Sequence, residues 1–191
     1  ASVNASYAAT YNPDIAAAYD RYQNRKVTKY TADELYADVT TFLKRQYLND
    51  SQFDMTILYY NDDPDTLYYT YNESSGMNFV QYQEYHRNIH SEICQFAQSL
   101  GTRVGFCSID GKYYMVRNLV NSYTFLPYAT LVMQLHEATG FGNLTNVVYE
   151  KDATIWVDGC GLNLKGTPVS RVEYRAAVNY PRRYPSIITG S

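Results

Sequence analysis

The residues of this chain best suited to acid–base or metal chemistry are its three histidines, and two of them stand one helical turn apart. His86, His90 and Cys94 recur at intervals of four residues, which places them in one line along a helix. Two side chains at this spacing can hold a transition metal, but a complete site needs further ligands. Half-buried, hydrogen-bonded histidines explain the same spacing. We therefore expect no metal centre and keep only His86 and His90 as metal candidates.

The third histidine, His136, begins a stretch whose first residues match the His-Glu-x-x-His pattern of zinc peptidases. In His136-Glu137-Ala138-Thr139-Gly140, however, glycine stands where the second zinc ligand belongs. A nucleophile–base pair would instead require Cys107 or Ser108 to meet His86 or His136 across a helix–sheet contact. No Gly-x-Ser-x-Gly elbow supports that pairing. A secreted hydrolase with a site at His86 and His90, or at His136, is therefore the alternative function.

Signals for cofactors and nucleic acid are absent from the sequence. Asp62, Asp63 and Asp65 form an acidic turn, but Thr66 stands where a calcium-binding EF-hand loop requires glycine. The chain has no phosphate-binding loop, and its net charge of −3 provides no basic field for nucleic acid. We therefore expect no cofactor and no nucleic-acid partner.

The most unusual feature of the composition is its 22 tyrosines against a single tryptophan. Side chains alternate between the two faces of a strand, so adjacent tyrosines in a hairpin project to opposite faces. If one face packs on helices, the other presents aromatic rings to protein partners or glycans. The predicted binding surface consists of Tyr59, Tyr60, Tyr68, Tyr69 and Tyr71. Tyrosines that only pack the rim of a helix-covered sheet remain the other interpretation.

Several features favour an extracellular location. Four Asn-x-Ser/Thr sequons are candidate glycosylation sites, at Asn4, Asn49, Asn72 and Asn143. The chain opens with Ala-Ser-Val-Asn, as a mature secreted protein does after removal of its leader. No apolar run reaches the roughly 18 residues that a membrane-spanning helix needs. We therefore expect a secreted glycoprotein without a membrane span.

The three cysteines allow one disulfide and leave one thiol over. Cys107 lies in a predicted strand and can pair either with Cys94 in the preceding helix or with Cys160 in a predicted turn. We expect one bond that involves Cys107. Three buried thiols are the open alternative.

The central element is an amphipathic helix over residues 80–100, because apolar side chains recur there at spacings of three and four. Gly101 ends it, and a hairpin follows in which Asp110-Gly111 predicts a type I′ turn. Asn12 and Pro13 begin an earlier helix. The capping box Thr31–Glu34 begins another that runs to about residue 48.

The remaining pattern predicts strands, one further helix and extended ends. A hairpin joins residues 53–60 to 66–71, and the apolar stretch from Pro127 to His136 is interpreted as a helix. Three further ranges are predicted strands: 146–149, 154–157 and 169–178. Residues 1–12 and 180–191 are expected to be extended. The order predicts a single α+β domain over residues 1–191, with an antiparallel sheet of hairpins packed against three to four helices.

These features favour a non-enzymatic interaction or assembly module that acts through the tyrosine surface and the extended termini. A surface or filament subunit, an adhesin-like domain and a secreted effector all fit this description. Ser186-Ile187-Ile188-Thr189 is short and β-prone, and we expect it to dock on the sheet edge of a neighbouring copy. The expected partners are therefore other proteins or further copies of this chain in a homo-oligomer, with glycans as a further ligand class.

Overall fold

A computed structural model describes residues 2–136, 147–149, 155–157, 160–162 and 168–169. At its centre lies a five-stranded sheet in the order β2-β1-β5-β4-β3, in which all neighbouring strands are antiparallel. Its strands are β1 (Phe53–Tyr60), β2 (Asp63–Tyr71), β3 (Val104–Ile109), β4 (Lys112–Val120) and β5 (Pro127–Leu135). The predicted α+β fold with an antiparallel sheet is confirmed.

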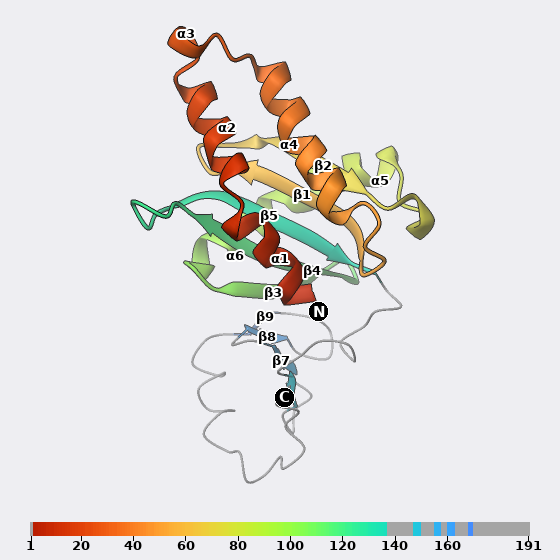
Figure 1. Cartoon of the computed structure of the whole chain (residues 1–191). Coiled ribbons are helices and arrows are strands. Elements are labelled where there is room, and N and C mark those ends of the chain that lie inside the picture. The colour runs from red at the N-terminus through yellow and green to blue at the C-terminus, as the bar shows by residue number, and fades with distance from the viewer. Residues whose placement is uncertain (1, 137–146, 150–154, 158–159, 163–167, 170–191) are drawn as a thin grey trace.

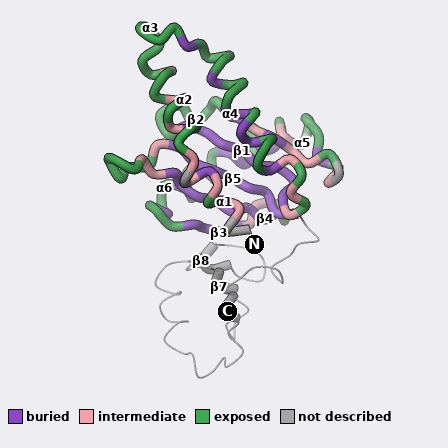
Figure 2. The backbone as a smooth tube through the Cα atoms, viewed as in Figure 1, coloured by how far each residue is buried: buried purple, intermediate pink, exposed green. Residues whose placement is uncertain are grey.

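Helices cover both faces of this sheet, so the molecule has three layers (Figure 1). One layer contains α1 (Ser2–Tyr11), α2 (Pro13–Gln23), the short α3 (Arg25–Thr28) and α4 (Ala32–Tyr47). The opposite layer contains α5 (Phe79–Glu84), the π-helical turn η2 (Tyr85–Ile89) and α6 (His90–Leu100), after a 3₁₀ turn η1 (Glu73–Ser75). Each layer forms its own apolar core against one sheet face, and Figure 2 shows the sheet buried between them.

Local sequence signals set several of these boundaries as predicted. The Asn12 side chain accepts a hydrogen bond from the Asp14 N–H at 2.7 Å and caps α2. Thr31 and Glu34 form the reciprocal capping box of α4. Asp110 and Gly111 have φ values of 51° and 76°, as a type I′ turn requires.

The predicted helix over residues 127–136 is wrong, because this stretch forms strand β5. The strand lies between β1 and β4 and is covered by helices on both faces, so seven consecutive residues, 129–135, are buried. A strand buried on both faces has a continuous apolar sequence, which periodicity does not distinguish from a buried helix.

The N-terminal segment is also different from the prediction, since residues 2–11 form helix α1 instead of an extended chain. This helix has no amphipathic pattern of its own. It is held by tertiary contacts: Ala9 is buried in the core, the Tyr47 hydroxyl donates to the Ala5 carbonyl at 3.2 Å, and the Arg117 guanidinium lies 4.3 Å from the centre of the Tyr7 ring. Propensity and pattern alone did not reveal those contacts.

The central helix covers nearly the predicted range, but it is not uniform. The π-helical turn η2 separates α5 from α6, which adds one residue to that turn and shifts the register of the side chains. Gly101 ends the helix with a φ of +61°, as expected from its freedom to adopt positive φ.

The short strands β6 (Val147–Tyr149), β7 (Ile155–Val157), β8 (Cys160–Leu162) and β9 (Pro168–Val169) form a second antiparallel sheet. The first two match predicted strands. Cys160, predicted in a turn, begins β8 instead. Residues 170–178 of the last predicted strand, and the C-terminal segment 180–191, lie outside the described residues.

A buried asparagine joins the second helical layer to the sheet. Asn118 in β4 is 6% exposed, and its side-chain N–H₂ donates to two carbonyl groups at the end of α6, those of Ala97 at 2.8 Å and Gly101 at 2.9 Å. Its side-chain oxygen accepts a hydrogen bond from the Thr130 hydroxyl of β5 at 2.9 Å. The last turn of α6 has carbonyls without partners in the helix, and Asn118 satisfies two of them.

We expect Asn118→Ala to lower the free energy of unfolding by about 2–3 kcal/mol, because it leaves the two carbonyl groups at the end of α6 without their side-chain donor. Urea denaturation measures this change. Asn88→Ala, at an exposed helical position, is the matched control and should change stability by less than about 0.5 kcal/mol. Equal stability of the two variants would show that Asn118 does not hold α6 on the sheet.

Candidate functional site

Three of the five tyrosines predicted to form a binding surface are buried. Tyr59, Tyr60 and Tyr68 are 3%, 1% and 5% exposed, so their predicted exposure is wrong. The reason is that helices cover both faces of the sheet, whereas the prediction left one face open. The Tyr60 hydroxyl, for example, donates to the carbonyl of Ile15 in α2 at 3.1 Å.

The other two predicted tyrosines, Tyr69 and Tyr71, are half-buried and lie on β2, the strand at one end of the sheet order. The Tyr69 ring stacks on that of Tyr82 from α5, with centroids 3.6 Å apart and planes inclined by 13°. It also lies 6.1 Å from the ring of Tyr71. Phe79, which is 51% exposed, lies 5.8 Å from Tyr82 and extends this aromatic group along α5.

A cleft of about 320 Å³ lies between helix α4 and the end of the sheet at β2. We call it the edge cleft. It is lined by Tyr36, Thr40, Lys44 and Leu48 of α4, by Tyr69, Thr70 and Tyr71 of β2, and by Glu73. The cleft therefore combines aromatic walls with one exposed cation and one exposed anion.

The backbone of β2 is open along this cleft. The Asn72 N–H donates to the Asp54 carbonyl of β1 at 2.9 Å. Hydrogen-bonded pairs alternate along an antiparallel ladder, so the N–H and C=O groups of Tyr68 and Thr70 also point toward β1. Those of Tyr69 and Tyr71 point away from it. Within the part of the chain that the structure describes, β1 is the only strand paired with β2.

Two tyrosine hydroxyls beside the edge cleft, those of Tyr69 and Tyr82, remain protonated at neutral pH. Burial, followed by the neighbouring Tyr69 and Tyr36, raises the pKa of Tyr82 to about 12. Burial also raises the pKa of Tyr69. Both side chains therefore act as neutral aromatic surfaces with a hydroxyl donor, which suits contacts with peptides and sugars but not proton transfer.

The predicted line of His86, His90 and Cys94 exists, but its central histidine is engaged in the fold. His90 is 4% exposed, and its Nε2 lies 2.6 Å from the carbonyl oxygen of Pro64. A carbonyl only accepts, so Nε2 carries the proton, and Nδ1 accepts from the Tyr85 hydroxyl at 3.3 Å. The Cys94 sulfur lies 3.4 Å from the protonated Nε2, which leaves no free nitrogen to activate the thiol.

The electrostatics of this group agree with its geometry. Burial lowers the pKa of His90 and raises the pKa of the Cys94 thiol, so both side chains favour their neutral forms. His86 is exposed, with its ring 6.5 Å from that of Tyr82. Among the described residues, no three His, Cys, Asp or Glu side chains gather as a metal site would require.

His136 directly follows strand β5 instead of ending a helix, and its Nδ1 lies 2.6 Å from a carboxylate oxygen of Asp54 in β1. Both residues line a pocket of about 190 Å³ with Ser75, Lys112 and Gln134. No local sequence signal indicates this pair, because 82 positions separate its two residues. The hydroxyl that lines the pocket belongs to Ser75, whereas the predicted nucleophiles Cys107 and Ser108 are not among the lining residues.

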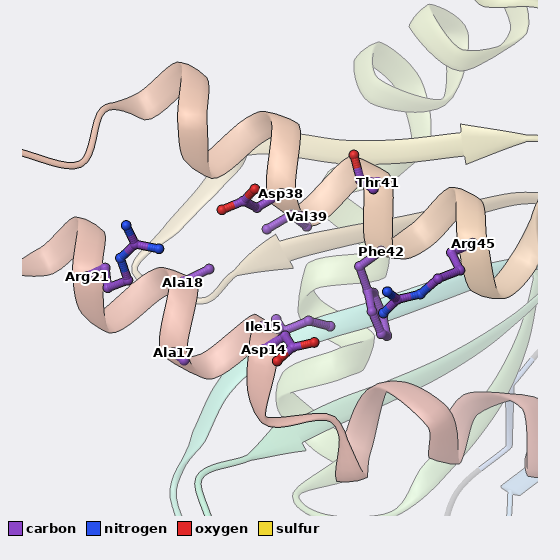
Figure 3. A pocket seen from close by; sticks show the side chains of 10 residues that line it. All are labelled: Asp14, Ile15, Ala17, Ala18, Arg21, Asp38, Val39, Thr41, Phe42 and Arg45. Atoms are coloured by element: carbon purple, nitrogen blue, oxygen red, sulfur yellow. The ribbon is translucent and has the colours of Figure 1, made fainter.

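A second groove of about 330 Å³ separates α2 from α4 (Figure 3). Arg21 and Asp38 lie toward one end of it, and Asp14 and Arg45 toward the other, over buried apolar side chains. The Arg21 guanidinium lies 4.2 Å from the centre of the Tyr30 ring. The groove lacks histidine, cysteine and serine, and its polar lining consists of two aspartates, two arginines and Thr41.

The predicted modification sites lie in different environments. Asn49 is exposed in the turn after α4, Asn72 is half-buried at the end of β2, and Asn4 lies in α1. Asn143 lies outside the described residues. Their glycosylation stays a prediction.

Cys94 is a free thiol, so it does not pair with Cys107. Cys107 is buried in β3, which contacts β8. The side chain of Cys160 lies outside the described residues, so a Cys107–Cys160 bond stays a prediction.

No family model matches the chain, and no curated protein matches its sequence. No helix in the described residues is both long enough and apolar enough to cross a membrane. The function of the chain therefore has to be inferred from its own residues and their geometry.

The lowered pKa of His90 predicts a pH-dependent stability. Below the ordinary histidine pKa of about 6.5, the unfolded chain binds a proton at this residue more readily than the folded chain does. The free energy of unfolding should therefore fall as the pH decreases from about 7.5 to about 5.5. His90→Gln should show a smaller fall over the same range.

Urea denaturation at both pH values measures the difference. The titratable groups around His90 are Tyr59, Tyr85, Cys94, His86 and Asp65. Burial raises the pKa values of the tyrosines and of the thiol, so they stay neutral in this range. Gln83→Ala, an exposed change on α5, is the control and should keep the wild-type slope. The same slope in His90→Gln would contradict the prediction.

Proposed function

We propose that this chain is an extracellular, non-enzymatic contact module that binds an extended segment of a protein partner along the open edge of β2. The observation that carries the proposal is the outward-facing backbone of Tyr69 and Tyr71 beside the stacked rings of Tyr69 and Tyr82. A strand added to a sheet edge satisfies backbone groups on both chains, and flanking pockets select its side chains.

The edge cleft has the features of such a contact. Tyrosine offers a large apolar area at a small cost in side-chain entropy, and its hydroxyl tolerates water. Exposed Lys44 and Glu73 at the cleft allow charge to select among partners. Residues Tyr69–Tyr71 contain no proline and no charged side chain that would blunt pairing, and Pro64 lies at the other end of the strand.

The partner segment that we propose is the C-terminal segment of a second copy of this chain. Adjacent residues on a strand point to opposite faces. Ile187 and Ile188 would therefore pack on the two sides of the β2 edge, one near Tyr82 of α5 and the other near Tyr36 of α4. The extracellular location is supported by the sequons, of which the one at Asn49 lies at an exposed turn.

Light scattering of the full chain at increasing concentration tests this assembly. We expect oligomers that dissociate when a synthetic peptide of residues 181–191 is added in excess, because the peptide occupies the same edge. The double variant Tyr69→Ala/Tyr82→Ala should assemble at least about tenfold more weakly, since it removes the aromatic stack. Deletion of residues 181–191 should also leave a folded monomer.

Tyr123→Ala is the matched control, because Tyr123 is 90% exposed but lies in the β4–β5 loop. This variant should assemble like the wild type. Thermal melting checks that each variant is folded. A monomeric wild type at high concentration, or a double variant that assembles normally, would contradict the proposal.

The second candidate function is a hydrolase at His136, and the 2.6 Å contact between His136 and Asp54 favours it. A carboxylate on Nδ1 orients a histidine so that Nε2 can serve as a general base. Ser75, which lines the same pocket, supplies a hydroxyl. The reaction class would be acyl transfer to water.

This candidate predicts hydrolysis of p-nitrophenyl acetate above the rate in buffer, and a loss of that excess by about 10²-fold or more in His136→Ala. His86→Ala, which changes an exposed histidine on the helix, is the control and should keep the full rate. Equal rates for the wild type, His136→Ala and buffer would exclude the hydrolase.

A further inference from the structure

The loop between β4 and β5 presents three large apolar side chains to solvent. Tyr123, Phe125 and Leu126 are 90%, 75% and 64% exposed. The loop protrudes beyond the end of the sheet (Figure 1), and its tip is exposed throughout (Figure 2). Exposed apolar residues that occur singly need no explanation, but three on one protruding loop indicate a contact site.

Hydrogen bonds within the loop fix its shape. The Asn121 side-chain oxygen accepts from the N–H groups of Tyr123 at 2.8 Å and Thr124 at 3.1 Å. The Phe125 N–H donates to the Asn121 carbonyl, and the Asn121 N–H donates to the Leu126 carbonyl, both at 2.9 Å. The Leu126 N–H contacts the Thr124 hydroxyl oxygen at 3.4 Å. Every backbone N–H from Tyr123 to Leu126 therefore has a partner inside the loop, and Pro127 has none to satisfy.

Phe125 adopts a φ of +57°, a left-handed conformation that is unfavourable for an aromatic residue. The Asn121 hydrogen bonds hold the loop in this conformation. The exposure of the Phe125 ring is therefore part of a defined loop structure.

Charge distinguishes the loop from its surroundings. The sequence from Asn118 to Leu135 contains no charged residue. At the loop's base, however, the Asn61 N–H donates to the Tyr128 carbonyl at 3.0 Å, which brings the acidic β1–β2 turn with Asp62 and Asp63 next to the start of β5. The apolar tip is thus uncharged, and the acidic turn lies beside the base of the loop.

We propose that this loop inserts shallowly into a zwitterionic phospholipid surface. Backbone donors that enter lipid must be satisfied internally, and the N–H groups from Tyr123 to Leu126 are. A protein partner could itself supply acceptors for such donors, whereas the hydrocarbon of a lipid layer cannot. A tyrosine beside a phenylalanine and a leucine is also a composition suited to the membrane–water interface. The neighbouring Asp62 and Asp63 repel anionic headgroups, so the loop's attraction to the membrane comes from its apolar side chains.

Co-sedimentation of the full chain with phosphatidylcholine vesicles tests the proposal. We expect binding that increases with lipid concentration and is no stronger when anionic phosphatidylglycerol is included. Phe125→Ser/Leu126→Ser should weaken vesicle binding about tenfold or more, because the variant has less apolar surface to transfer from water into the lipid. Val27→Ser is the matched control, since Val27 is 85% exposed on the distant α3, and it should bind like the wild type.

A fluorescence measurement locates the loop directly. Phe125→Trp should show a blue-shifted emission with vesicles and quenching by brominated phosphatidylcholine, after subtraction of the wild-type signal from Trp156. Absence of binding to phosphatidylcholine, binding only to anionic vesicles, or unchanged binding by Phe125→Ser/Leu126→Ser would overturn the proposal. If the chain does not bind phosphatidylcholine vesicles, the loop would instead be a contact site for a protein.

Discussion

The constraint on which the whole structure depends is the burial of strands β1 and β5 on both faces. Every residue of β1 is buried, and seven consecutive residues of β5 are. A strand that is apolar on both faces must be covered on both, so helices are required on each side of the sheet. The layer of α1, α2 and α4 and the layer of α5 and α6 meet that requirement. Asn118 adds a polar connection between the sheet and α6.

This arrangement determines where the molecule can make contacts. Because helices cover both faces of the sheet, its remaining accessible parts are the edges and the loops at its ends. Tyrosines in the centre use their hydroxyls inside the fold, as Tyr60 does with the Ile15 carbonyl. Tyr69 and Tyr71, on the end strand, keep part of their rings at the surface and their backbone groups directed outward. The proposed contact sites, the edge cleft and the β4–β5 loop, both lie at such positions.

Local signals in the sequence were sufficient to predict much of the fold. Asn12 and the Thr31–Glu34 capping box act on backbone groups a few residues away, and Asp110-Gly111 sets its own turn, so each can be interpreted without the rest of the chain. Strand β5 and helix α1 could not be predicted in this way. Their identity depends on neighbours distant in sequence: β1 and β4 for the strand, and Tyr47 and Arg117 for the helix.

The candidate site was predictable in part, for the same physical reason. Tyr69 and Tyr71 follow from the tyrosine-rich strand, but Tyr82 joins them only through the packing of α5 on the sheet. The pairing of His136 with Asp54 depends on the alignment of β5 beside β1, which the sequence does not show. The exposure of Tyr59, Tyr60 and Tyr68 was misjudged because covering both sheet faces is a property of the whole fold.

The central claim is that the β2 edge is open in the isolated chain, and hydrogen exchange resolved by residue with NMR tests it most directly. At low protein concentration, the amides of Tyr68 and Thr70 should exchange slowly, because they pair with β1, while those of Tyr69 and Tyr71 should exchange rapidly. At concentrations where the chain assembles, Tyr69 and Tyr71 should become protected. Equal protection of all four amides at low concentration would show that the edge is already covered and would contradict the account.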